Sequence, residues 1–329
     1  MTSIYPRIDL SRLKTMSIAD RASKVCVTDF AALHRFGDSV SRFLDNLPDI
    51  LAGRSVRALI DRISSAAARG KPVVAAMGAH VVKCGLSPIL VDLIRRGVIT
   101  AVATNGAGAI HDFEIARFGR SSEDVVEGLR SGTFGMAEET AAFLNGAAKT
   151  ASDEELGFGE ALGRALCSGE TPYADSSILA AAYECRVPCT VHVCIGCDIV
   201  HMHPSADGAA IGDAGLRDLR ILTRAMRDLG GGGVLMNLGS AVVLPEVVLK
   251  ALTTLINLGR DMRGMTGANV DFVQQYRSNQ QIVARVREIG GEGISLTGHH
   301  ELMIPLIAAG VIEKMGSTRQ TAARRQEDR

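Results

Sequence analysis

The sequence predicts a doubly wound α/β fold with a mostly parallel sheet, and three observations support this prediction. The chain contains six short aliphatic runs, five of them followed directly by a glycine-containing turn, as strands buried on both faces of a parallel sheet often are. Segments with helical periodicity separate these runs, so that strand and helix alternate along the chain. Hydrophobic residues make up 47% of the chain and charged residues 22%, which is typical of a globular protein with a sizeable core.

The elements are predicted in the following order. Residues 1–70 form a helical extension, with amphipathic patches in FLDNLPDILAGRSVRALIDRISSAAARG. The α/β domain spans residues 71–316, and its segment 119–170 has no strong strand candidate and is predicted to be a helical insertion. Residues 317–329 are charged and lack apolar periodicity, so we expect this tail to fray. The six predicted strands are 72–77, 98–104, 188–195, 232–238, 269–273 and 293–297.

Charge and composition exclude several classes of function. The chain has 36 Lys and Arg against 36 Asp and Glu, so it has no electrostatic reason to bind nucleic acid or an anionic membrane. No apolar run approaches the roughly 20 residues of a membrane span, and the N-terminus lacks the pattern of a secretory signal. The seven cysteines make a disulfide framework unexpected. We therefore expect a cytoplasmic protein whose partner is a small molecule.

Polar residues follow the predicted strands, where ligands bind to open parallel sheets. Seven of the eight histidines lie in or just after these runs, which indicates a polar cleft for binding or catalysis. Imidazole titrates near neutral pH and suits general acid–base chemistry, and glycine turns let a backbone approach a nucleotide. The candidate catalytic residues are His80, His111, Asp112, Asp198 and His299. The candidate cofactor-binding residues are Gly78, Ala79, Asn105, Gly106, Gly108, Gly239 and His300.

A metal site is an alternative interpretation of one dense segment. The pattern H-x-C-x-x-C-D-x-x-H-x-H follows the third predicted strand and is rich in the ligand types that zinc and iron prefer, although its spacing matches no standard zinc motif. Cys197 beside a histidine base could also act as a thiol nucleophile. Each histidine could equally be a locally hydrogen-bonded structural residue. The candidate ligands of a divalent transition metal are His192, Cys194, Cys197, His201 and His203.

The order of these motifs over residues 70–315 resembles the deoxyhypusine synthases. GAHVVKCGLSP and TNGAGAIHDFE are similar to the family's first nucleotide-side loops, and SSILAAAYECRVPCTVHVCIGCDI to its third strand region. The family's I-x-L-G-G-G-V-V-K-H-H segment is similar to GGVLMNLGSAVVLPEV, and its D-A-S-L-x-x-P-L segment is similar to HHELMIPLIAAGVIEKM. The resemblance implies a Rossmann-like fold, NAD as cofactor and a homotetramer.

Departures from the family pattern imply a different activity. Leu244 stands where the family has the lysine that forms an imine with the butylamine group, so that covalent route cannot start from this position. Ile110 and His111 replace an acidic pair, and His299 replaces an aspartate. Lys83 is a possible replacement for the missing lysine.

Three functions are consistent with these residues. The first is a diverged enzyme of this family that binds NAD or another nucleotide and acts on a small substrate other than spermidine. The second is a metal-dependent enzyme or metal-binding protein, and the third is a non-catalytic binding subunit on the same scaffold. We expect a homo-oligomer, because the mean hydropathy of +0.16 suggests apolar surface that self-association would bury.

Overall fold

Six parallel strands form one sheet in the order β3-β2-β1-β4-β5-β6, which confirms the predicted fold class. The computed structural model describes the backbone of residues 4–327 and the side chains of residues 4–316. Each strand overlaps one of the six predicted runs. The strands are β1 (Val73–Met77), β2 (Ala101–Asn105), β3 (Cys189–His192), β4 (Val234–Leu238), β5 (Thr266–Asp271) and β6 (Glu292–Thr297).

Helices connect and cover the strands. The α-helices before β3 are α1 (Val40–Asp45), α2 (Leu51–Ala68), α3 (His80–Lys83), α4 (Ser87–Arg95), α5 (Gly106–Phe118), α6 (Val125–Ser131), α7 (Glu138–Asp153), α8 (Phe158–Ser168) and α9 (Ile178–Glu184). The later ones are α10 (Gly208–Ala225), α11 (Val243–Asn257), α12 (Tyr276–Ser278), α13 (Arg285–Glu288) and α14 (His300–Glu327). Short 3-10 helices are η1 (Ile18–Asp20), η2 (Val27–Asp29), η3 (Ala174–Ser176) and η4 (Ile199–Met202), and η5 (Asn279–Ala284) is a π-helix.

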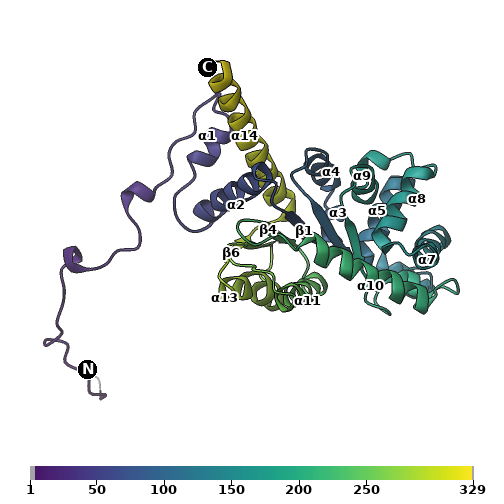
Figure 1. Cartoon of the computed structure of the whole chain (residues 1–329). Coiled ribbons are helices and arrows are strands. Elements are labelled where there is room, and N and C mark those ends of the chain that lie inside the picture. Colours follow the sequence, from purple (N-terminus) through teal and green to yellow (C-terminus); the bar gives the residue numbers. More distant parts are fainter. Residues whose placement is uncertain (1–3, 328–329) are drawn as a thin grey trace.

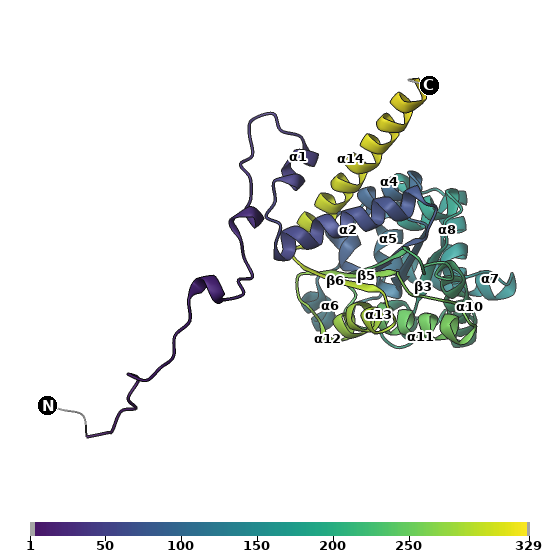
Figure 2. The same cartoon turned by 60° about the vertical axis from the view of Figure 1, so that its left-hand side comes forward.

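The sheet separates two hydrophobic cores, because successive strand residues point to opposite faces. Val73, Ala75 and Met77 of β1 join a core with residues of α2, α4 and α14. Val74 and Ala76 join a second core with residues of α10, α11 and α13. Figure 2 shows α2 and α4 on one side of the sheet and α11 and α13 on the other. Both faces are therefore buried, which explains why the strands are continuously apolar in sequence.

The two ends of the chain project from this body. Residues 4–39 form an arm with only two short 3-10 helices, η1 and η2, and the arm leads away from the sheet (Figure 1). At the other end, α14 continues as helix to Glu327, and the expected fraying of residues 317–329 stays a prediction. Ala, Arg, Gln and Glu dominate this tail, and extending an existing helix needs no new nucleation. The predicted segment boundaries at residues 70 and 316 stay a prediction.

The strand order fixes where a ligand-binding crevice can form. The chain runs outward from β1 to β2 and β3, and then returns to β4 on the other side of β1. Loops after β1 and β4 therefore diverge at the carboxyl edge, which is the usual ligand position in such sheets. None of the helices in the described part of the chain is long and apolar enough to cross a membrane.

Candidate functional site

A cavity of about 600 Å³ lies at the carboxyl edge of the sheet, beside the start of α5. We call it the α5 pocket. One wall comes from the first turns of α5, which begins directly after β2, and another comes from the loop after β3. Its polar lining residues are Lys83, His111, Glu114, Arg120, Ser121, Ser122, Glu123, Cys197 and Asp198.

Helix α5 positions the central residues of this pocket. Its first turn is capped by Asn105, whose side chain accepts a hydrogen bond from Gly108 N at 2.9 Å. Its last turn ends at Gly119, which takes a left-handed conformation with φ of +69° and bonds back to Ile115 O. His111 and Glu114 are three residues apart on this helix and therefore lie on the same face.

A hydrogen-bonded relay links these two side chains through Ser121. The Ser121 hydroxyl donates to Glu114 Oε2 at 2.5 Å. Ser121 Oγ also lies 2.5 Å from His111 Nδ1. Because the Ser121 proton is directed to the carboxylate, His111 Nδ1 must be the donor in its own bond to Ser121. Neutral His111 then carries its proton on Nδ1, and Nε2 is left as a proton acceptor.

Glu114 is well suited to anchor this relay as a charged carboxylate. Burial alone would raise the pKa of its carboxyl, but the nearby His111 ring and the hydrogen bonds from Ser121 and Thr140 outweigh that effect and lower the pKa. Thr140 donates to the other carboxylate oxygen at 3.0 Å. Both side chains are mostly buried, with His111 17% and Glu114 16% exposed. The relay is therefore a fixed arrangement.

The glycine turn at the start of α5 does not fit a phosphate group. A Cβ added to Gly106 would lie 2.0 Å from Asp198 Oδ2, so the Asp198 carboxylate already occupies this helix N-terminus. Burial raises the pKa of Asp198, and its Oδ2 has no hydrogen-bond partner. A Cβ on Gly108 would lie 2.0 Å from Thr104 Oγ1, so this glycine serves internal packing. A second anion here would be repelled, and we place no cofactor phosphate on Gly106 or Gly108.

Asp112 does not join the pocket; its carboxylate holds helix α9. Its oxygens accept from Ser177 Oγ at 2.6 Å, Ile178 N at 2.8 Å and Leu179 N at 3.1 Å. Asp112 is 3% exposed and burial raises its pKa to about 6. The expected catalytic role thus gives way to a structural one, because Asp112 faces the body of the protein while His111 faces the pocket.

Several of the other predicted residues gather around Phe272, which follows β5. The ring centroids of His80, His299 and His300 each lie 6.1 Å from that of Phe272, and His80 lies 5.7 Å from His300. His80 and His299 are exposed, whereas His300 is buried and contacts Val270 O through Nε2 at 3.3 Å. We call these four residues the Phe272 cluster.

Two predicted glycines allow close packing below this cluster. A Cβ on Gly78 would lie 2.4 Å from Gly239 O, and one on Gly239 would lie 2.5 Å from the His300 ring. Gly239 also has a φ of +66°, which favours glycine. Ala79 follows Gly78 and caps α3, the short helix that carries both His80 and Lys83. Helix α3 therefore connects the Phe272 cluster with the α5 pocket.

The predicted metal ligands are dispersed among separate local contacts. His192 is buried against Thr190 Oγ1 at 3.0 Å, and burial lowers its pKa to about 4. His201 accepts from Gly196 N at 3.2 Å, and His203 bonds to Gly135 O at 2.8 Å. Within the described residues, no three His, Cys, Asp or Glu side chains are arranged to hold a metal ion. The metal-dependent alternative stays a prediction without support from this geometry.

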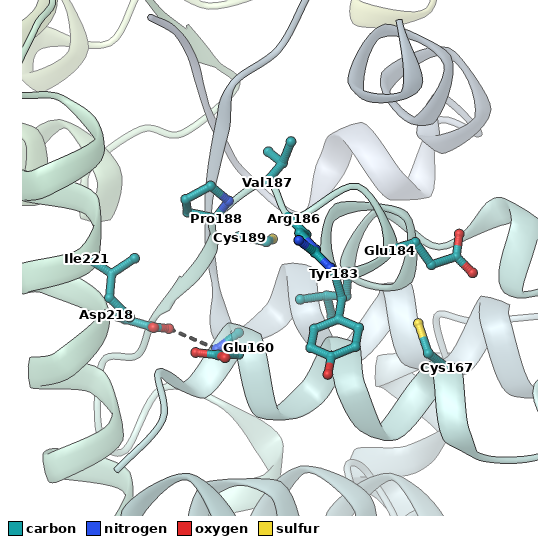
Figure 3. A pocket seen from close by; sticks show the side chains of 12 residues that line it. Glu160, Cys167, Tyr183, Glu184, Arg186, Val187, Pro188, Cys189, Asp218 and Ile221 are labelled. Atoms are coloured by element: carbon teal, nitrogen blue, oxygen red, sulfur yellow. Dashed lines mark hydrogen bonds between the residues drawn. The ribbon is translucent and has the colours of Figure 1, made fainter. Parts of the chain in front are cut away.

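A second cavity, of about 630 Å³, lies beside the start of edge strand β3 (Figure 3). Asp218 of α10 contributes to its wall and accepts from Gly159 N at 3.0 Å and Val191 N at 2.6 Å. This carboxylate thereby fastens the first turn of α8 to the free edge of the sheet. Burial raises the pKa of Asp218 to about 7. The cavity lies away from the residues that follow the strands, so we do not consider it the functional site.

Three residues of the candidate site were missed by the sequence argument. Glu114 could have been found, since it lies one helical turn after His111. Ser121 follows the end of α5, and only the folded chain shows that it turns back to bridge His111 and Glu114. Phe272 could not have been selected, because nothing in the sequence distinguishes an exposed aromatic residue after a strand from a core residue.

No family model matches the sequence, and no curated protein matches it either. Solved structures do match, all at low identity. The ternary complex of AgrE with ornithine and NAD+ is 14% identical and has a TM-score of 0.50, and the alignment covers 82% of this chain and 34% of that chain. Unliganded AgrE is 15% identical with a TM-score of 0.50, covering 80% of this chain and 34% of that chain. This chain thus spans only about a third of the length of AgrE.

Two further matches have lower TM-scores. A protein from Entamoeba histolytica assigned as a deoxyhypusine synthase is 11% identical, with a TM-score of 0.47 and coverage of 84% of this chain and 94% of that chain. A conserved protein from Methanococcus maripaludis S2 assigned as LOR/SDH is 14% identical, with a TM-score of 0.48 and coverage of 84% and 71%. The chain is therefore similar in fold to AgrE.

Proposed function

We propose that this chain is an NAD-dependent enzyme that acts on a small substrate in the α5 pocket, with His111 as the general base. The observation that supports this most strongly is the relay from Glu114 through Ser121 to His111. A charged carboxylate at one end of the relay stabilises the imidazolium that forms when Nε2 takes a proton. A histidine buried only for packing would not need this arrangement at the wall of a pocket.

The pocket lining favours a substrate with an anionic group. Lys83 and Arg120 line the pocket, and neither has an ion-pair partner among the described side chains. In contrast, Glu114 and Glu123 are engaged, the latter by Gly135 N at 3.0 Å and 3.1 Å. The two free cations could bind a carboxylate or a similar group while His111 acts on a neighbouring proton. Asp198 is a third carboxylate in the lining, so we expect the anionic group to bind beside Lys83 and Arg120 and not at the start of α5.

The Phe272 cluster is where we propose that NAD binds. It lies on the loops after β1, β5 and β6, beside the point where the strand order reverses. Phe272 is 49% exposed and could stack on a ring of the dinucleotide, flanked by His80 and His299. The likeness in fold to AgrE, whose complex contains NAD+, supports the choice of cofactor. NAD would supply a hydride acceptor, while His111 would accept the accompanying proton.

Two measurements test this proposal. The first is titration of the full chain with NAD+ and with NADH by calorimetry, for which we expect saturable binding that Phe272→Ala weakens. The second follows NADH formation with a panel of amino and hydroxy acids, including ornithine. We expect His111→Gln to lower turnover by about 10²–10⁴-fold while NAD+ binding is retained.

His34→Gln is the matched control, because His34 is an exposed histidine on the N-terminal arm. This variant should behave like the wild type in both assays. Binding of NAD+ without turnover of any substrate would favour the non-catalytic alternative. Absence of NAD+ and NADH binding would refute the cofactor, and full turnover in His111→Gln would refute the general base.

A further inference from the structure

Cys194 and Cys197 lie in the loop between β3 and η4, with their sulfur atoms in contact. The Cys197 thiol lies 3.3 Å from Cys194 Sγ. Cys197 N also bonds to Cys194 O at 2.9 Å, and Gly196 between them has a φ of +93°. Such a hydrogen-bonded turn brings its first and fourth Cα atoms within about 7 Å, a span that a disulfide can bridge. The sulfur atoms would need to approach by only about 1.2 Å to reach bonding distance.

Both thiols are accessible to a reaction partner from solvent. Cys194 and Cys197 are exposed, and so are the residues between them, Ile195 and Gly196. An exposed loop can adjust its backbone at little cost, because few packed contacts resist the movement.

This turn is connected to the wall of the α5 pocket. Cys197 lines that pocket, and the next residue is Asp198. The Asp198 carboxylate fills the space beside Gly106 at the start of α5. A change in the turn therefore reaches the first turn of the helix that carries His111.

We propose that Cys194 and Cys197 form a reversible dithiol–disulfide redox site whose oxidation displaces Asp198 at the start of α5. The oxidant is a low-molecular-weight disulfide such as glutathione disulfide. The Cys194 thiolate attacks one sulfur of the oxidant, and the first glutathione thiolate leaves. Cys197, as its thiolate, then attacks Cys194 Sγ and releases the second. The protein loses two thiol protons and two electrons, and the oxidant becomes two thiols. This proposal does not depend on the proposed function.

The experiment equilibrates the full chain in mixtures of reduced and oxidised glutathione with a chelator present, followed by alkylation and peptide mass spectrometry. We expect the peptide with Cys194 and Cys197 to lose the mass of two hydrogens under oxidising conditions and to regain it on reduction. Cys197→Ser should instead trap glutathione on Cys194, because the second thiolate is missing. Cys185→Ser is the control, since Cys185 is exposed elsewhere, and it should leave the internal disulfide unchanged.

Hydrogen exchange tests the second half of the proposal. Oxidation should change the exchange rate of the Ala107 amide, which follows Gly106 at the point where the Asp198 carboxylate packs. The Ala209 amide is the internal control, because Asp207 caps it at 2.9 Å on a different helix. An internal disulfide that never forms, or glutathione that stays on Cys194 in the wild type, would overturn the redox site. An unchanged Ala107 rate in the oxidised protein would overturn the displacement of Asp198.

Discussion

Asp112→Ala should destabilise the protein strongly, because the carboxylate is the acceptor for three buried donors. The substitution leaves the N–H groups of Ile178 and Leu179 and the hydroxyl of Ser177 without this acceptor. Each such loss costs about 1–3 kcal/mol. The variant also no longer buries a charge. The rise of the Asp112 pKa from 3.8 to about 6 means that burying this charge costs the wild type about 3 kcal/mol at neutral pH, and the variant regains that amount. Three such losses less the buried-charge cost leave a net loss of about 0–6 kcal/mol at pH 7, and we expect a value near the middle of that range.

The pH dependence of this loss has a defined sign. The folded-state pKa of Asp112 is raised, so the native protein keeps a proton that the unfolded chain releases between about pH 4 and pH 6. Stability from this group is complete at low pH and is lost as the pH rises through that window. Asp112→Ala has no such dependence. The difference between wild type and variant should thus be largest near pH 4 and smaller at pH 7.

Urea unfolding followed by circular dichroism measures this difference. Asp207→Ala is the matched control, because Asp207 also accepts two backbone N–H bonds at a helix start but is exposed. Its loss should be about 0.5–2 kcal/mol. Equal losses in the two variants, or a difference that grows with pH, would refute the reasoning. Lost activity with unchanged stability would restore the catalytic role expected for Asp112.

Three further predictions follow from other parts of the molecule. The raised pKa of Asp218, about 7, makes its contribution to stability fall as the pH rises from about 4 to 7, so Asp218→Asn should remove that part of the pH dependence in urea unfolding. The purified chain should not cleave spermidine in the presence of NAD+, because Leu244 is fully buried and has no amine; spermidine-dependent NADH formation would contradict this. Light scattering should give the mass of a homotetramer, because the arm exposes apolar residues such as Ile8, Leu13 and Phe36. Removal of residues 1–39 should lower the mass of the assembly to that of a smaller oligomer or a monomer. A monomeric wild type would contradict this prediction.

The sheet could be predicted from sequence because its strands are buried on both faces. Runs such as PVVAAM leave little choice between strand and helix when glycine turns bound them. The fifth strand begins earlier than predicted, at Thr266, because the Thr-Gly-Ala segment resembles a turn in isolation. There Gly267 is required by packing, since a Cβ would lie 2.2 Å from Ile282 O. Such a tertiary contact has no signal in the local sequence.

The candidate site was only partly predictable, for a geometric reason. The sequence places His111 and Asp112 together after a strand, but neighbouring helix positions point in different directions. One side chain faces the α5 pocket and the other faces α9, and the sequence does not specify which. The glycine turn at Asn105–Gly108 likewise suggests a phosphate site until Asp198, distant in sequence, is seen to occupy it. Asp198, which the loop after β3 brings to the start of α5, thus excludes a phosphate from this helix N-terminus.

The tautomer of His111 tests the central claim most directly. Nitrogen-15 NMR of the imidazole distinguishes a proton on Nδ1 from one on Nε2 without requiring a substrate. We predict that neutral His111 carries its proton on Nδ1 in the wild type, because Ser121 donates to Glu114 and accepts from His111. Ser121→Ala should weaken this preference while the fold is retained. A proton on Nε2 in the neutral wild-type protein would contradict the relay and, with it, the assignment of His111 as the general base.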